Sequence, residues 1–131
     1  MKIRTDRLPW KLDLKLVTIL EQDLTRSGII DDVTIIYRDG DYTPEGGGFH
    51  PVEFSFRRDG TLLYATDFCY VGCPPMCDLC KCLDFDFSLA TFRNFDMEHP
   101  INEGREVFQL FQSNFIAYHG INAYTATVEP W

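Results

Sequence analysis

Apolar residues recur every three or four positions in two segments of the chain, with polar residues between them. In the first segment the apolar positions are Leu12, Leu16, Ile19, Leu20 and Leu24. This spacing predicts an amphipathic helix of about four turns, with Pro9 in its first turn and Gly28 at its end. In the second segment they are Val107, Phe108, Phe111, Phe115 and Tyr118. This stripe predicts a helix that Asn102 caps and Gly120 stops.

Between and after these helices, short segments either are rich in β-branched and aromatic residues or alternate apolar with polar positions, which predicts strands. They span residues 33–38, 51–58, 61–70, 83–89 and 123–128. The predicted order is therefore α-β-β-β-β-α-β. We expect one α+β domain over residues 1–131, with one mostly antiparallel sheet of about five strands and two helices packed on one face.

Asp59-Gly60 lies between two alternating segments, which is a strong signal for a β-hairpin. If these are the two central turn residues, the predicted pairs are Phe56 with Leu63, Phe54 with Ala65, Val52 with Asp67, and His50 with Cys69. Directly paired residues share one face of the sheet, so this apolar face ends at His50, Asp67 and Cys69. These three residues either complete the rim of the core or form a site for a ligand or partner.

Three consecutive glycines, Gly46 to Gly48, precede this hairpin. They allow positive φ angles and close backbone approach, so they form either an anion-binding nest or a flexible entry into the hairpin. Because no helix follows them, the flexible entry is favoured. The candidate residues for binding a ligand or partner are Gly47, Gly48, His50, Asp67 and Cys69.

Five cysteines lie within the fourteen residues from 69 to 82, largely in a predicted loop: Cys69, Cys73, Cys77, Cys80 and Cys82. Cys77-x-x-Cys80 has the spacing of half a structural zinc site, and the candidate metal ligands are Cys73, Cys77, Cys80 and Cys82, with Cys69 or His50 as alternatives. The complete spacing matches no standard zinc pattern. We therefore expect no cofactor, with all five thiols reduced, and keep zinc as the alternative.

The chain carries 12 Lys and Arg residues against 20 Asp and Glu residues, a net charge of −8. This charge repels phosphate backbones and anionic membrane surfaces, so we expect no nucleic-acid and no membrane partner. The charged N-terminus and the frequently interrupted apolar residues after it predict neither a signal peptide nor a membrane span. The expected location is the cytoplasm, where thiols stay reduced.

Three segments carry a resemblance to a known family. They are Gly47-Gly48-Phe49-His50-Pro51-Val52-Glu53, Thr66-Asp67-Phe68-x-Tyr70 and Asn114-Phe115-Ile116-x-Tyr118-His119-Gly120. With these segments the chain resembles a small bacterial domain-of-unknown-function family of marine gamma-proteobacteria. The resemblance implies a soluble, bacterial, single-domain protein and places His50 and Asp67 in distinctive segments. It implies no activity, cofactor or catalytic residue, and dense cysteines are not a feature of the family.

These observations favour a small cytoplasmic binding or interaction domain that meets another protein or a small ligand through its sheet face or the segment from Gly46 to His50. A structural zinc-binding domain is the alternative. The third hypothesis is a cysteine-dependent enzyme, because Cys69, His50 and Asp67 have the residue types of a thiol triad. A mid-strand cysteine is hard for a substrate to reach, and no nucleotide-binding or hydrolase motif occurs, so no catalytic activity is inferred.

Overall fold

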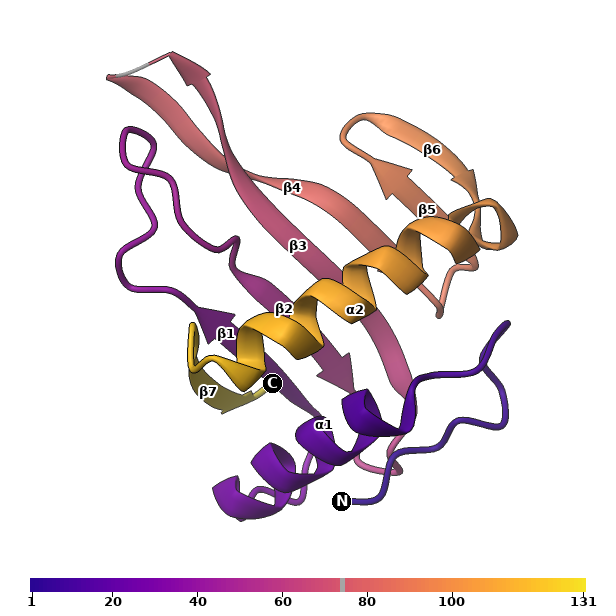
Figure 1. The fold of residues 1–131 in the computed structure, drawn as a ribbon. Helices are drawn as coiled ribbons and strands as arrows, with labels where there is room; N and C mark the ends of the chain where they lie inside the picture. The colour runs from indigo at the N-terminus through magenta and orange to yellow at the C-terminus, as the bar shows by residue number, and fades with distance from the viewer. Residues whose placement is uncertain (74) are drawn as a thin grey trace.

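One antiparallel sheet with two helices on one face makes up the fold (Figure 1). The computed structural model describes residues 1–73 and 75–131. In these residues the strands are β1 (Val33–Arg38), β2 (Val52–Phe56), β3 (Leu62–Cys73), β4 (Met76–Asp86), β5 (Thr91–Asn94), β6 (Met97–Pro100) and β7 (Thr125–Pro130). The helices are α1 (Leu14–Ser27) and α2 (Arg105–Gly120), and the short 3-10 helix η1 (Ile101–Gly104) directly precedes α2. None of these helices is long and apolar enough to cross a membrane.

The strands lie in the order β6-β5-β4-β3-β2-β1-β7, and each neighbouring pair is antiparallel. The first six strands form a meander, and β7 returns after α2 to pair with β1. The α+β class and the antiparallel sheet are confirmed, but the described residues form seven strands rather than about five. β5 and β6 have four residues each and are joined by a turn at Phe95, whose φ is 54°. Strands this short leave too little alternation for a sequence pattern to show.

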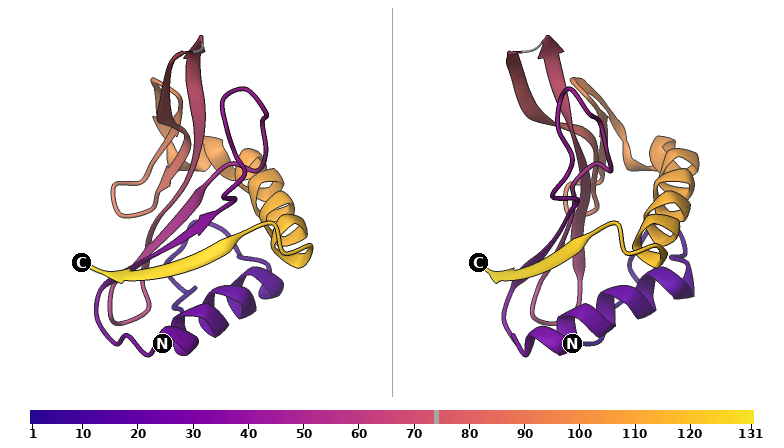
Figure 2. Two further views of the ribbon diagram at one scale, coloured as in Figure 1. Left: turned by 90° about the vertical axis from the view of Figure 1, so that its left-hand side faces the viewer. Right: turned by 60° about the vertical axis from the view of Figure 1, so that its left-hand side comes forward.

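Both helices cover the same face of the sheet (Figure 2), and aromatic side chains dominate the core between them. The fully buried aromatic residues are Tyr37, Phe54, Phe56, Phe85, Phe108 and Phe115. Edge-to-face contacts join the two layers: the ring centroids of Phe85 and Phe108 are 5.0 Å apart, and those of Phe54 and Phe115 are 5.1 Å apart. Burial of each such ring contributes about 1.5–3 kcal/mol, so these contacts fix the path of α2 across the sheet.

The start of α1 differs slightly from the prediction. The Asp13 carboxylate caps the helix by accepting a hydrogen bond of 2.8 Å from the Lys15 N–H. Pro9 therefore lies before the helix rather than in its first turn. The end is as predicted, because Gly28 has a φ of 72°, a left-handed conformation that glycine adopts without strain.

α2 ends at Gly120 as predicted, but it begins later than expected. Asn102 lies within η1 and makes no capping hydrogen bond. The junction between η1 and α2 is set instead by Gly104, which packs directly on the Phe92 ring of β5. A Cβ at Gly104 would lie 2.7 Å from the Phe92 Cγ. The close contact with the sheet, rather than a polar cap, decides where the helix starts.

The turn of the β2–β3 hairpin is one residue away from the predicted one. The Gly60 N–H donates to the Arg57 carbonyl at 2.9 Å, and the Arg57 N–H donates to the Thr61 carbonyl at 3.0 Å. The central turn residues are therefore Arg58 and Asp59. Gly60 follows with a φ of 91°, the left-handed bulge position that commonly closes such a turn.

A second irregularity restores the register further along this hairpin. Phe56 pairs with Leu62, not with Leu63, and a register shift between Ser55 and Phe56 follows. The predicted pairs Phe54–Ala65 and Val52–Asp67 are consequently confirmed. The predicted His50–Cys69 pair is wrong, because β2 begins at Val52 and Cys69 pairs with Cys80 on β4.

The outer part of β3 and β4 extends past the helices as a two-stranded ribbon (Figure 1). The sequence predicted a loop here, whereas β3 reaches Cys73 and β4 begins at Met76. Where the ribbon joins the body of the sheet, Asp67 pairs with Leu83 and Phe68 pairs with Lys81. Cys82 is therefore the extra residue of a bulge.

Candidate functional site

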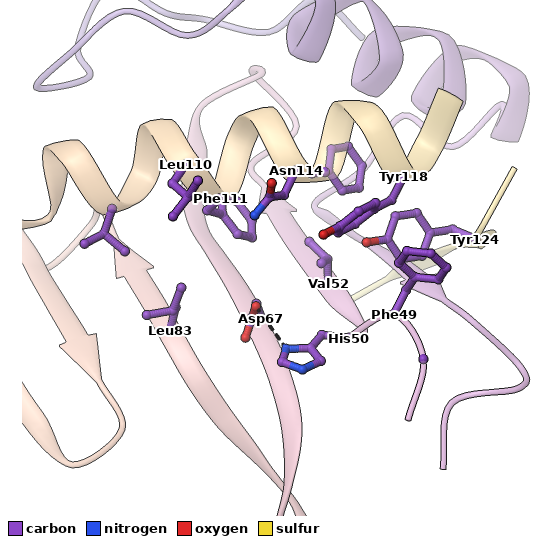
Figure 3. Close-up of a pocket in the computed structure, with 13 residues that line it drawn as sticks. Phe49, His50, Val52, Asp67, Leu83, Leu110, Phe111, Asn114, Tyr118 and Tyr124 are labelled. Atoms are coloured by element: carbon purple, nitrogen blue, oxygen red, sulfur yellow. Dashed lines mark hydrogen bonds and ion pairs between the residues drawn. The ribbon is translucent and has the colours of Figure 1, made fainter. Parts of the chain in front are cut away.

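A pocket of about 340 Å³ lies between α2 and the sheet, beside the segment that leads into β2 (Figure 3). The apolar residues that line it are Phe49, Val52, Leu83, Val107, Leu110, Phe111 and Phe115. The polar side chains are those of His50, Asp67, Asn114, Tyr118 and Tyr124, and the backbone of Gly48 completes the lining. A concave, mostly apolar pocket with a few convergent polar groups is typical of small-molecule sites.

The segment from Asp39 to His50 is held in place by its own contacts and brings His50 to the floor of the pocket. The Phe49 N–H donates to the Asp39 carboxylate at 3.0 Å, and this bond holds the pKa of Asp39 below its usual range. Gly48 has a φ of 134°, and a Cβ there would lie 2.9 Å from the Tyr42 Cα. Only glycine allows this approach. The Tyr42 ring then packs against His50, with ring centroids 5.4 Å apart.

The other glycines of this segment serve its internal structure. The Gly46 N–H donates to the Thr43 hydroxyl at 2.8 Å, and the Gly47 N–H donates to the Thr43 carbonyl at 2.9 Å. Because both donors are used inside the segment, they are not free to hold an anion as a nest would. Gly48 lines the pocket, and Gly47 does not.

Asp67 lies on β3 opposite Val52, and its carboxylate stands at the floor of the pocket beside His50 (Figure 3). Asp67 Oδ2 is 3.4 Å from His50 Nδ1, and the two side chains are 17% and 44% exposed. Burial raises the pKa of Asp67, and the adjacent His50 opposes that shift. Asp67 Oδ1 is buried and has no hydrogen-bond partner in the described residues. The carboxylate therefore keeps an unused acceptor.

Cys69 and Cys82 form a disulfide next to this pair, with their Cα atoms 5.9 Å apart. The expectation of five reduced thiols is therefore corrected for these two residues. The bulge on β4 brings Cys82 beside Cys69 of β3, which the sequence spacing alone does not indicate. Cys69 consequently lacks the free thiol that a catalytic triad with His50 and Asp67 would need.

The predicted metal-ligand set of Cys73, Cys77, Cys80 and Cys82 is not brought together. Cys73, Cys77 and Cys80 have free thiols on the ribbon. Residues three apart on a strand point to opposite faces, so Cys77 and Cys80 cannot form the chelate that a tight turn would give. Within residues 1–73 and 75–131, the one cluster of three potential ligand atoms lies elsewhere. It consists of His50, Asp67 and Cys82, whose ligand atoms are within 4.8 Å of one another.

Sequence reasoning missed the polar residues on the opposite wall. Asn114 and Tyr118 project from α2, and Tyr124 projects from the segment before β7, toward the floor of the pocket (Figure 3). The rings of Phe49 and Tyr118 have centroids 4.6 Å apart, and burial raises the pKa of Tyr124. One signal was available: Asn114 lies three residues after Phe111 and four before Tyr118. A polar residue therefore interrupts the apolar stripe of the helix.

The fold defines a class of small α+β domains in which two helices cover one face of a seven-stranded antiparallel sheet. The chain belongs to the family described as "Protein of unknown function (DUF2787)", whose model matches residues 12–129. The resemblance to a domain-of-unknown-function family is thereby confirmed.

Two solved structures of Vibrio cholerae proteins are similar to nearly the whole chain. The hypothetical protein VC0508, from the VSP-II pathogenicity island, is 30% identical in sequence to this chain, and the two structures superpose with a TM-score of 0.82. The matched region covers 97% of this chain and 98% of VC0508. The conserved hypothetical protein VC1805, from pathogenicity island VPI-2, is 32% identical with a TM-score of 0.82, covering 97% and 99%. It is described as sharing structural homology with the human P32 protein. No curated protein matches the chain.

Proposed function

We propose that this chain is a binding domain that takes a small organic ligand in the pocket between α2 and the sheet. The single observation that carries the proposal is an apolar pocket of about 340 Å³ at whose floor one carboxylate oxygen of Asp67 has no hydrogen-bond partner among the described residues. A buried acceptor without a partner costs about 1–3 kcal/mol, and a ligand with an N–H or O–H group removes that cost.

The lining defines the chemistry of the ligand. Phe49, Val52 and Phe111 offer apolar contact to a flat or branched hydrocarbon part. Asp67 accepts a hydrogen bond from a polar end, and Asn114 donates and accepts on the opposite wall. The net charge of −8 and the carboxylate at the floor disfavour anionic ligands, nucleic acids and anionic membrane surfaces. The ligand is therefore a neutral or cationic molecule with one apolar side.

Two other hypotheses of the sequence analysis, a cysteine-dependent enzyme and a protein-binding sheet face, have less support. Catalysis by Cys69 requires a thiol, and its sulfur is bonded to Cys82. A protein partner is also less well supported, because the centre of the open face of the sheet is lined by pairs of polar side chains that already bond to one another. The Thr66 hydroxyl donates to Asp84 at 2.7 Å, and the Thr34 and Ser55 hydroxyls are 3.2 Å apart.

The test is a screen of small neutral and amine-containing aromatic molecules by two-dimensional amide NMR on the full chain. We expect shift changes confined to residues that line the pocket, and saturable binding by at least one compound. Asn114→Ala should raise the Kd by roughly 2–10-fold because it removes a hydrogen bond. Leu110→Trp should block binding because the side chain lies at the pocket, and it is exposed, so the fold should tolerate the change.

Leu89→Trp is the matched control, because Leu89 is similarly exposed but does not line the pocket. It should bind each compound as the unmodified chain does. Shift changes that map to another surface, or binding that survives Leu110→Trp, would overturn the proposal. A screen without any saturable pocket-directed compound would do so as well.

A further inference from the structure

His50 and Asp67 of the pocket floor belong to a cluster of potential metal ligands that also includes Cys82, which does not line the pocket itself. His50 precedes β2, Asp67 lies on β3 and Cys82 lies in the bulge of β4, so three separate segments contribute. Their nitrogen, oxygen and sulfur ligand atoms lie within 4.8 Å of one another. The sulfur of Cys69 joins this group through its bond to Cys82.

This donor set fits zinc. Zinc takes thiolate sulfur, imidazole nitrogen and carboxylate oxygen at roughly 2.0–2.3 Å, in a tetrahedral arrangement. Ligand atoms of such a site are therefore on the order of 3.5 Å apart. His50 Nδ1 and Asp67 Oδ2, at 3.4 Å, already have that separation. Asp67 Oδ1 offers a further lone pair without a hydrogen-bond partner in the described residues. Hard cations that prefer only oxygen ligands do not fit this set.

We propose that the Cys69–Cys82 disulfide is the oxidised, metal-free form of a redox-controlled zinc site made by His50, Asp67, Cys69 and Cys82. A disulfide sulfur is not a thiolate and does not bind zinc in this way. Reduction by two equivalents of a thiol breaks the sulfur–sulfur bond, places one hydrogen on each cysteine sulfur and leaves the reductant as its own disulfide. Zinc then displaces the two thiol protons to solvent and is held by the four side chains.

The position of the site gives this switch a consequence. Zinc binding uses the lone pairs of the Asp67 and His50 atoms that face the pocket. The floor of the pocket therefore has different hydrogen-bonding groups in the reduced, zinc-loaded chain and in the oxidised chain. The site is distinct from the cysteines of the ribbon. Cys73, Cys77 and Cys80 have no place in it, although Cys77-x-x-Cys80 has the spacing of half a structural zinc site.

The experiment measures zinc binding to the full chain, stripped of metal with a chelator and then prepared in reduced or oxidised form. Native mass spectrometry counts the zinc ions, and competition with a chromogenic chelator gives the affinity. We expect one zinc per reduced chain and none per oxidised chain. Cobalt added to the reduced chain should give the charge-transfer absorption of thiolate ligation, which a site without cysteine does not show.

His50→Ala and Cys82→Ser should each weaken zinc binding by at least about 10-fold. His50 is half-exposed and outside the strands, so its replacement leaves the core intact and keeps the test valid if Cys82→Ser fails to fold. Cys77→Ser is the matched control and should leave the affinity unchanged. The proposal is overturned if the reduced chain binds no stoichiometric zinc. It is equally overturned if zinc is lost on Cys77→Ser while His50→Ala retains it.

Discussion

At the scale of single residues, a buried carboxylate joins three elements of the fold. Asp23 of α1 accepts a hydrogen bond of 2.7 Å from the Tyr37 hydroxyl of β1. His119 Nε2 of α2 is 3.7 Å from the same carboxylate, and Arg26 Nη1 is 3.4 Å from its other oxygen. Burial and the bond to Asp23 raise the pKa of Tyr37. Asp23 lies three residues after Leu20 and four after Ile19, so the periodicity places this charged residue on the apolar face of α1, but it does not indicate the hydroxyl partner on β1.

Tyr37→Phe should lower the free energy of unfolding by about 1–3 kcal/mol, because it leaves the buried Asp23 carboxylate without its hydroxyl donor. The measurement is a urea titration. Tyr64→Phe is the matched control: its hydroxyl makes no hydrogen bond to the described residues, so the midpoint should barely move. Equal effects of the two substitutions would show that the hydroxyl of Tyr37 contributes nothing specific.

Glu53, on the open face of the sheet, links stability to pH. Burial raises its pKa above 4.5, while Arg38 and Lys81 oppose the shift. An acid with a raised native pKa destabilises the fold when ionised, and this cost fades as the pH falls through that raised value. As the pH is lowered from about 7 to about 4, the free energy of unfolding of the unmodified chain should therefore rise relative to that of Glu53→Gln. Urea midpoints of both chains at each pH check this, and a constant difference would contradict it.

At the scale of elements, the sequence predicted what local patterns encode. Both helices, β1 and the pairs Phe54–Ala65 and Val52–Asp67 were within reach, because apolar periodicity and a turn signal suffice for them. The four-residue strands β5 and β6 carry too little pattern. The start of α2 depends on Gly104 meeting Phe92, a contact between distant residues that no local signal encodes.

Some residues of the candidate site could also be predicted from local patterns, and others could not. His50 and Asp67 could be placed near each other by counting along one hairpin, even though the predicted turn was displaced. The second wall comes from Asn114, Tyr118 and Tyr124, which meet the hairpin only through the packing of α2. The Cys69–Cys82 bond was missed because it depends on a bulge, and a bulge of one residue changes which side chains meet.

Gly104→Ala should destabilise the chain by about 1–3 kcal/mol, because the new Cβ collides with the Phe92 ring where η1 joins α2. Thermal unfolding followed by circular dichroism measures the effect. Gly120→Ala provides the control at the other end of α2, where a Cβ meets nothing within 4 Å. There alanine should be neutral or stabilise by up to about 1 kcal/mol. A neutral Gly104→Ala would mean that the junction has room to shift.

In the molecule as a whole, one disulfide links β3 to β4 at the base of the projecting ribbon. It closes a loop with a sequence separation of 13 residues. A loop of that length should stabilise the fold by about 2–3 kcal/mol through the unfolded state.

Reduction in the presence of a metal chelator should therefore lower the free energy of unfolding by about 2–3 kcal/mol in a urea titration. A chain with both Cys69→Ser and Cys82→Ser should be insensitive to the reductant, since Cys73, Cys77 and Cys80 are already free thiols. A reductant effect of the same size in that double variant would assign the stabilisation to something other than this bond.

The pairing of β7 with β1 has a consequence for how the chain folds. Every other strand pairs with its neighbour along the chain, but Val33 pairs with Pro130 and Arg38 with Thr125. Such distant contacts carry the largest loop-closure entropy and form late. During synthesis the outer edge of β1 therefore stays open, able to pair with a second nascent chain, until residues 125–130 have been made. The newly made chain is thus most exposed to aggregation after β1 has been synthesised and before β7 has been.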